Sequence, residues 1–244
     1  MERARWVKKL NLPGYDLSFG IRSKMELARV IRFKEEWTVD WINSLPEGSV
    51  LWDVGANIGI MSSVAAVRDE IDQVVAIEPF FMNYSAIVEN LMLNGLSHKV
   101  TVVCGGLGET TAFIPLKLQN VVAGGALHSF GDIFKMGQQS TVPVAEQSCL
   151  CFRIDDLVTY DGIPFPTHIK IDIDGFELSM LKGAENTLAD PRLKGIQVET
   201  MDHDENAPQR KAVTALIERH GFRLADEIVH KSDKAIVFDL QFAR

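Results

Sequence analysis

A strand that breaks into a glycine-bracketed turn constrains this chain more than any other feature. Residues 50–59 read Val-Leu-Trp-Asp-Val-Gly-Ala-Asn-Ile-Gly, an apolar run typical of a buried strand, and a helical pattern follows. The two glycines allow the backbone to bend and a ligand to approach, and the first N–H groups of the next helix can bind a carboxylate or a phosphate. The segment therefore predicts a nucleotide-cofactor cradle that includes Gly55, Ala56, Asn57 and Gly59.

The glycine spacing narrows the class of cofactor. The turn has no Gly-Lys-Ser/Thr, so no ammonium or hydroxyl is placed for a triphosphate and its magnesium. Its spacing is Gly-x-x-x-Gly, whereas dinucleotide sites have Gly-x-Gly-x-x-Gly. An adenosyl cofactor that carries a carboxylate in place of a pyrophosphate fits this turn better, and a nicotinamide oxidoreductase is disfavoured.

The next apolar segment ends in an acidic residue that belongs to the same cradle. Residues 73–78 read Gln-Val-Val-Ala-Ile-Glu, and Glu78 follows the turn by about 20 residues, the distance at which doubly wound folds bind a ribose diol. Glu78 can accept hydrogen bonds from both ribose hydroxyls, and an adenine can lie against the ring of Phe80. The alternative for Glu78, taken alone, is a solvated acid at the start of a helix.

The rest of the chain alternates strands with helices. Strands are predicted at 50–54, 73–78, 99–104, 167–173 and 194–200. Helices are predicted between and after them, at 58–68, 81–94, 176–188 and 208–220. This alternation predicts a doubly wound, Rossmann-like α/β fold with a parallel sheet and right-handed crossovers. Two further pairs of β-rich segments predict a closing antiparallel pair (222–229 and 234–240) and an inserted hairpin around a glycine-containing loop (110–117 and 141–152).

Length and composition fit one domain with an N-terminal extension. The chain has 244 residues, of which 46% are hydrophobic, enough for a sizeable core. We expect a helical extension or lid over residues 1–46 and one domain over 47–244, with an insertion at about 110–152. The net charge of −8 argues against duplex nucleic acid and anionic membranes as partners. No apolar run reaches the roughly 20 residues of a membrane span and no secretion signal is visible, so we expect a cytoplasmic protein.

Three ordered motifs carry a family resemblance that covers nearly all of the chain from about Lys34 onward. They are residues 53–59 (Asp-Val-Gly-Ala-Asn-Ile-Gly), residues 78–79 (Glu-Pro), and a long third block at 154–157 (Ile-Asp-Asp-Leu), 169–177 (Ile-Lys-Ile-Asp-Ile-Asp-Gly-Phe-Glu) and 181–185 (Leu-Lys-Gly-Ala-Glu). With these motifs the chain resembles the FkbM-type enzymes among the class I S-adenosylmethionine-dependent methyltransferases. One departure is Asp174, where the family more often has Glu, so the carboxylate is shorter by one methylene.

The resemblance implies a seven-stranded mixed sheet with S-adenosylmethionine bound across the carboxyl ends of its strands. By their positions in the motifs, the residues of the turn at 55–59 are implied to bind the methionine carboxylate, and Glu78 the ribose. Gly106 and Leu107, in the turn after the third strand, are implied to border the adenine. The alternative for that glycine turn is a plain β-turn.

Two acidic residues are candidates for the ammonium group of this cofactor. The resemblance implies that Asp53 or Asp172 binds it, and the alternative for Asp53 is a carboxylate that only caps the next turn. Lys170 lies on a strand expected to be buried on both faces, where an unpaired ammonium is costly. Alternation places Lys170 on the same face as Asp172, and Glu199 on the next strand is a candidate partner. We therefore expect a structural ion pair beneath the cofactor rather than a catalytic lysine.

The candidates for catalysis lie near the ends of the fourth and fifth strands. Methyl transfer to oxygen or nitrogen is an in-line displacement, so positioning supplies much of the acceleration, and a base is needed only where the acceptor loses a proton. The candidates are Asp174 and His203, whose neighbouring carboxylates raise its basicity. The alternative for His203 is an exposed acidic loop with an incidental histidine. His128 and Ser129, in the glycine-flanked loop, are candidates for substrate contact or are loop residues with no chemical task.

Two broader alternatives concern metal and function. Four carboxylates, at Asp172, Asp174, Asp202 and Asp204, suggest a magnesium site, but no spacing fixes their geometry and we expect no metal. We predict methyl transfer from S-adenosylmethionine to a hydroxyl of a small molecule, sugar or secondary metabolite, the oxygen preference coming from the resemblance alone. The alternative is a catalytically silent cofactor-binding subunit that scaffolds or regulates a partner. The oligomeric state is left open, with a homodimer as one option.

Overall fold

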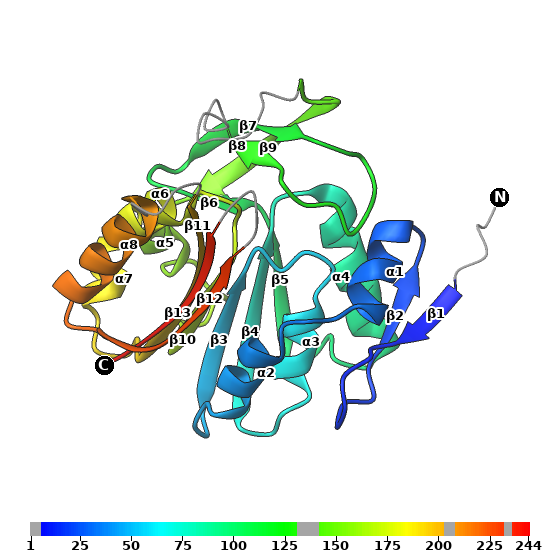
Figure 1. Cartoon of the computed structure of the whole chain (residues 1–244), viewed down its shortest axis with the longest axis horizontal. Helices are drawn as coiled ribbons and strands as arrows, with labels where there is room; N and C mark the ends of the chain where they lie inside the picture. The colour runs from blue at the N-terminus through cyan, green and yellow to red at the C-terminus, as the bar shows by residue number, and fades with distance from the viewer. Residues whose placement is uncertain (1–5, 131–141, 203–207, 232–235) are drawn as a thin grey trace.

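A mixed β-sheet forms the centre of the computed structural model, which describes residues 6–130, 142–202, 208–231 and 236–244 (Figure 1). Within these residues the sheet has seven strands in the order β12-β13-β11-β10-β3-β4-β5. All neighbours are parallel except β13, which is antiparallel to both β11 and β12. The strands are β3 (Ser49–Val54), β4 (Ile71–Glu78), β5 (Val100–Cys104), β10 (His168–Ile171), β11 (Gly195–Asp202), β12 (Arg223–Lys231) and β13 (Ile236–Ala243). The predicted doubly wound fold with a closing antiparallel pair is confirmed.

Helices cover both faces of this sheet, which is why its strands read as continuous apolar runs. Leu51 and Trp52, neighbours on β3, are both fully buried and belong to the cores on opposite faces. One face is covered by α2 (Glu36–Asn43), α3 (Ile60–Ala66) and α4 (Phe81–Leu93). The other is covered by α5 (Ile154–Leu157), α6 (Glu177–Lys182), α7 (Glu185–Ala189) and α8 (Pro208–Arg219). No helix in the described ranges is long and apolar enough to cross a membrane.

One predicted helix, at 176–188, is two short helices in the structure. The interruption falls at Gly183, between α6 and α7. A Cβ on Gly183 would lie 2.1 Å from the carbonyl oxygen of Gly108, so the helix reaches the neighbouring loop only because this position has no side chain.

The N-terminal segment contains strands as well as helices. An antiparallel pair, β1 (Trp6–Lys9) and β2 (Ser18–Ile21), precedes α1 (Lys24–Ile31). All four residues of β1 are exposed, so this strand has no alternating pattern that a sequence could reveal. The side-chain oxygens of Asn90 on α4 and of Asn94, which caps the end of that helix, each accept a hydrogen bond from a backbone N–H of β2, at 2.9 Å. The segment is therefore attached to the face of the domain through α4.

A second, smaller sheet takes the place of the predicted hairpin. Its four strands within the described residues are in the order β6-β9-β7-β8, and in Figure 1 it lies across the upper end of the large sheet. They are β6 (Gly106–Leu107), β7 (Ala112–Leu118), β8 (Ser129–Phe130) and β9 (Ala145–Phe152). The predicted hairpin corresponds to β7 and β9, while β6 and β8, at two residues each, are too short to produce a pattern.

Candidate functional site

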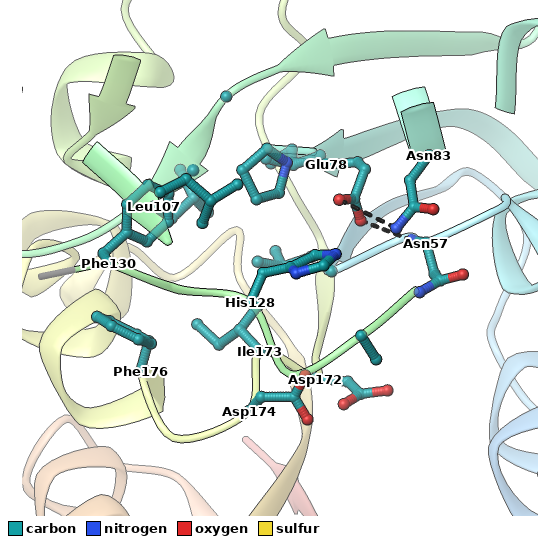
Figure 2. A pocket seen from close by; sticks show the side chains of 18 of the residues that line it. Asn57, Glu78, Asn83, Leu107, His128, Phe130, Asp172, Ile173, Asp174 and Phe176 are labelled. Atoms are coloured by element: carbon teal, nitrogen blue, oxygen red, sulfur yellow. Dashed lines mark hydrogen bonds between the residues drawn. The ribbon is translucent and has the colours of Figure 1, made fainter. Parts of the chain in front are cut away.

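A cleft lies at the carboxyl ends of the central strands, beneath the smaller sheet (Figure 2). In open α/β sheets this is the edge at which ligands bind. In Figure 2, Glu78, Asn57 and Asn83 lie on one side, Leu107, Phe130 and Phe176 on the other, and Asp172 and Asp174 below. The predicted site residues that line the cleft are Gly55, Asn57, Glu78, Gly106, Leu107, His128, Asp172 and Asp174.

The turn after β3 is fixed by its close approach to β10. Gly55 has a φ of +81°, and a Cβ there would lie 1.8 Å from the carbonyl oxygen of Asp172. The N–H groups of Gly55 and Ala56 both donate to the carbonyl of Ile77, at 3.0 and 3.1 Å. Gly59 also has a φ of +81° and is the N-cap residue of α3. The sequence-based expectation of a glycine-dependent bend at Gly55 is therefore met, with Gly59 completing the turn behind the cleft.

Glu78 joins this turn to the end of β4. Its carboxylate accepts hydrogen bonds from the N–H of Asn57 and of Phe80, both at 2.9 Å, and from the side-chain amide of Asn83 at 3.4 Å. Only 5% of the residue is exposed, and burial raises the pKa of Glu78 to about 7, although the two backbone donors oppose the shift. Because Glu78 lines the cleft, its lone pairs are within reach of a ligand that enters it.

Phe80 and Ser129 are not where the sequence suggested. The ring of Phe80 is fully buried in the cluster beneath the smaller sheet, and it is the backbone of Phe80 that contacts Glu78. Ser129 lies on β8 and is 4% exposed. Neither residue lines the cleft, because packing of the smaller sheet encloses both side chains. The expectations of an adenine platform at Phe80 and of substrate contact at Ser129 are not met.

Asp53 is part of a buried ion network rather than of the cleft. Its side chain is 0% exposed, and its Oδ2 accepts a hydrogen bond from the hydroxyl of Ser62 at 2.6 Å. The Nζ of Lys170 lies 3.6 Å from Asp53 and 3.3 Å from Asp172. Burial alone would lower the pKa of Lys170, but Asp172 and Asp53, with Glu199 contributing less, raise it above its ordinary value. Of the two candidates for an ammonium group, Asp172 is the one that faces the cleft.

Asp174 stands at the edge of the cleft in a strained turn. Its φ is +52°, which residues other than glycine adopt rarely. Its Oδ2 accepts a hydrogen bond from the N–H of Leu127 at 2.8 Å. The side chain is exposed toward the cleft, yet the surrounding protein withdraws it from bulk water and, with nearby Asp172, raises the pKa of Asp174 to about 6. A carboxylate with this pKa is ionised at neutral pH and basic enough to accept a proton.

Two polar side chains in the cleft have unused hydrogen-bonding atoms. Nδ1 of His128 accepts from the N–H of Gln119 at 3.2 Å, so Nε2 carries the proton, and Nε2 has no partner among the described residues. Burial lowers the pKa of His128 to about 4, which keeps the ring neutral. The Oδ1 of Asn57 is likewise without a partner in the described part of the chain. These atoms offer one donor and one acceptor to a polar ligand.

A loop over residues 123–128, here called the roof loop, closes the cleft. The carbonyl of Gly125 accepts from Asn57 at 2.9 Å and from Asn83 at 3.1 Å, and the carbonyl of Gly124 accepts from Nε of Arg29 at 2.7 Å. The free volume below it is about 80 Å³, less than the roughly 300 Å³ at which ligand pockets begin. We therefore expect the roof loop to move outward when a nucleoside enters.

The donor set of the cleft fits an adenosyl cofactor with an amino-acid tail. Glu78 supplies paired acceptors for a diol, and Asp172 supplies a carboxylate for an ammonium group. Gly106 and Leu107 form an apolar wall, where a Cβ on Gly106 would come within 2.3 Å of the Phe130 ring. The turn at Gly55 keeps backbone close to the place where the tail would lie.

Arg29 is a candidate that the sequence analysis missed. It lies on α1 and lines a hollow together with Gly55, Ala56, Asn57 and Asp172. Lys170 lines the same hollow, so two cationic side chains border it. No local sequence pattern distinguishes Arg29 from the arginines around it. Its position beside the Gly55 turn follows from the packing of α1 against the roof loop, which the sequence alone does not reveal.

Some of the predicted acidic and basic residues lie outside the described residues. His203 and Asp204 are among them, and Asp202 is described only as the last residue of β11. Within the described ranges, no group of three or more His, Cys, Asp or Glu side chains is arranged to hold a metal ion.

Comparisons with known proteins agree on one family. Residues 53–224 match the Methyltransferase FkbM domain. The hexuronic acid methyltransferase AglP of Haloferax volcanii is 27% identical over 177 residues, which cover 72% of this chain and 67% of AglP.

Solved structures agree on the fold. Methyltransferase FkbM from Methylobacillus flagellatus KT has a TM-score of 0.55 at 20% identity, over 80% of this chain and 44% of that one, so the chain spans less than half of that protein. Streptococcus pneumoniae Sp1610, solved in complex with S-adenosyl-L-methionine, has a TM-score of 0.50 at 14% identity, over 85% of this chain and 70% of that one.

Proposed function

This chain belongs to the FkbM methyltransferase family, whose cofactor is S-adenosylmethionine. We propose that it transfers the methyl group to a hydroxyl of a small molecule, and that this small molecule is a sugar. The observation that carries the proposal is the cleft in which Glu78 and the Gly55 turn face Asp172. The match to AglP, a protein named for methylation of a hexuronic acid, supports a sugar as the acceptor class.

The residues of the cleft are assigned by what each can donate or accept. Glu78 binds the ribose hydroxyls, and Gly106 and Leu107 border the adenine. The turn from Gly55 binds the methionine carboxylate, with Arg29 as its counter-charge across the hollow. Asp172 binds the ammonium group. When bound, the cofactor supplies a methyl group on a sulfonium, which is already an activated leaving group.

The protein's own chemical task is to orient the acceptor and take its proton. Asp174 is the proposed base, because it lines the cleft and its pKa of about 6 leaves it ionised at neutral pH. His203 remains a second candidate from the sequence. The neutral ring of His128 donates from Nε2 to an oxygen of the ligand and stays neutral while it does so.

Calorimetry with S-adenosylhomocysteine tests the cofactor assignment. We expect Glu78→Ala to weaken binding at least tenfold, because a hydrogen bond to a charged group contributes about 1.5–3 kcal/mol. Glu70→Ala is the matched control, since Glu70 precedes the other end of β4 and is 46% exposed. Equal affinity of the Glu78 variant and the wild type would discard the ribose assignment.

A labelled-methyl experiment tests catalysis. The wild-type protein is incubated with methyl-labelled cofactor and a mixture of sugars and other hydroxylated metabolites, and products are identified by mass spectrometry. We expect label on an acceptor hydroxyl. Label on nitrogen would refute the oxygen assignment, and label that never leaves the cofactor would identify a silent cofactor-binding subunit.

A further inference from the structure

A second cavity adjoins the cleft and is lined by acidic side chains. It has a volume of about 430 Å³, within the range of small-molecule sites. It lies where the start of α2 faces β10, β11, β12 and β13. Five acidic side chains line this cavity, here called the acidic cavity: Glu35, Glu36, Asp172, Glu199 and Asp239. The basic side chains that line it are two lysines and one histidine: Lys34, Lys170 and His230.

Two of the three cationic groups in the acidic cavity are already engaged with carboxylates. Lys170 forms its ion pairs with Asp53, which lies outside the cavity, and with Asp172. His230 lies 3.1 Å from one oxygen of Asp239. Lys34 is the third cation of the cavity, so the five carboxylates outnumber the cationic side chains that line it.

Glu199 and Asp239 sit opposite each other on the paired strands β11 and β13. The nearby charge of Asp172, with burial, raises the pKa of Glu199 to about 9, and burial raises the pKa of Asp239. Both pKa values are raised although Lys170 and His230 act to lower them, so the positive charge nearby compensates this pair of acids only in part, and a cation placed between them would be attracted.

An independent observation points to a ligand in the same place. Gln197 lines the acidic cavity and is only 2% exposed. Its amide nitrogen donates to the hydroxyl of Thr38 at 2.7 Å, whereas its Oε1 has no partner among the described residues. A buried acceptor that is left unpaired is costly unless a donor reaches it. A ligand N–H or O–H in the cavity would supply that donor.

The acidic cavity is continuous with the cofactor site. Asp172 lines both the cleft and the acidic cavity, and Glu35 and Lys170 line both the cavity and the hollow beside the Gly55 turn. A molecule in the cavity would therefore have one end at Asp172, next to the place assigned to the amino-acid tail of the cofactor.

We propose that the acidic cavity binds the methyl acceptor and selects one that carries an ammonium group as well as hydroxyls, such as an amino sugar, over its uronic acid counterpart. The proposal rests on the proposed function. Asp172, Asp239 and Oε1 of Gln197 accept hydrogen bonds, which hydroxyl and ammonium groups donate. Glu199, whose pKa is about 9, becomes such an acceptor when a bound cation displaces its proton. A carboxylate on the acceptor would meet like charge, which is how a site rejects a competitor. The proposed preference is opposite in charge to the acceptor for which AglP is named, a hexuronic acid.

Three methyl glycosides of matched shape test the selection: those of glucosamine, glucose and glucuronic acid. Their binding to the protein saturated with S-adenosylhomocysteine is measured by ligand-observed NMR titration. We expect the glucosaminide to bind at least tenfold more tightly than the glucuronide, with the glucoside between them. Glu199→Gln and Asp239→Asn keep the side-chain volume, and each should reduce the advantage of the ammonium compound by about tenfold, which corresponds to about 1.4 kcal/mol.

Glu218→Gln is the control for a change of net charge. Glu218 is exposed on α8, which covers the opposite face of the sheet, so the ranking of the three glycosides should not change. The inference is overturned if the glucuronide binds as tightly as the glucosaminide, if none of the three binds at millimolar concentration, or if both cavity variants keep the wild-type ranking. The proposed function fails separately, when the wild-type protein takes up no S-adenosylhomocysteine or transfers no label.

Discussion

The buried lysine of β10 allows the sharpest test of how the site is supported. Lys170 is 7% exposed and stands between Asp53, which is 0% exposed, and Asp172. Lys170→Met keeps the length of the side chain and removes its charge, which leaves the carboxylate of Asp53 buried with the Ser62 hydroxyl as its hydrogen-bond donor. Breaking a buried pair from one side costs about 3–5 kcal/mol, so we expect the free energy of unfolding to fall by that amount.

A double variant distinguishes the loss of the Lys170–Asp53 ion pair from the cost of leaving the Asp53 carboxylate buried without a cation. In Asp53→Asn/Lys170→Met no charge is left at position 53, so we expect part of the loss to be recovered, with a coupling of about 1–3 kcal/mol between the two changes. The measurement is urea unfolding at neutral pH, followed by circular dichroism and tryptophan fluorescence. Affinity for S-adenosylhomocysteine is measured on the same samples, and the double variant should still bind it.

Lys182→Met is the control for loss of a lysine. Lys182 is 48% exposed and lies 3.8 Å from a carboxylate oxygen of Glu109, an exposed pair of the kind that contributes about 0–1 kcal/mol. The reasoning is refuted if Lys170→Met costs no more than this control, or if the Asp53 and Lys170 changes are additive. A Lys170→Met protein of normal stability without methyl transfer would instead make Lys170 a catalytic group.

Three further substitutions test the cofactor turn and the two candidate bases. Gly55→Ala should weaken S-adenosylhomocysteine binding at least tenfold in calorimetry, because its Cβ would lie 1.8 Å from a backbone oxygen of Asp172. The control is Gly162→Ala, where φ is +85° and the space around the residue is open; it should cost about 1–2 kcal/mol of stability and leave binding intact. Equal effects of the two substitutions on binding would contradict the role of the turn. The wild-type kcat/KM should fall as the pH drops below about 6, since the base must be ionised and the pKa of Asp174 is about 6. Asp174→Asn should lower kcat by about 10²–10⁴-fold and abolish that acidic limb while cofactor affinity persists, and a variant with the wild-type profile would exclude Asp174 as the base. His203→Ala should lower turnover with cofactor affinity retained, and normal turnover in a steady-state assay would remove His203 from the mechanism.

The elements that the sequence predicted well are those whose environment is set locally. The strand from Ser49 to Val54 is buried on both faces, so it had to be a continuous apolar run. Gly55 follows the end of β3 and Glu78 is the last residue of β4, so both were found from the residues next to them in the sequence. The strand from Trp6 to Lys9 was missed because all its residues are exposed and its partner is set by chain contacts beyond its own pattern.

The parts that escaped prediction depend on elements brought together from afar. The ring of Phe80 was expected to face an adenine, but its direction is decided by the smaller sheet packed above it. Arg29 reaches the cofactor side only because α1 binds the roof loop, which lies 95 residues away in sequence. Gln197 and Thr38, 159 residues apart, meet in the acidic cavity because α2 crosses the sheet there. Contacts between residues this far apart in the sequence produce no periodic pattern from which they could be predicted.

The roof loop has a kinetic consequence. Its hydrogen bonds reach four separate parts of the chain: Ser23 and Arg29 on the N-terminal side, Asn57 after β3, Asn83 on α4, and Asp174 after β10. We expect exchange of the cofactor to require release of these hydrogen bonds. The frequency of that release would then set an upper bound on turnover, however fast the methyl transfer itself is.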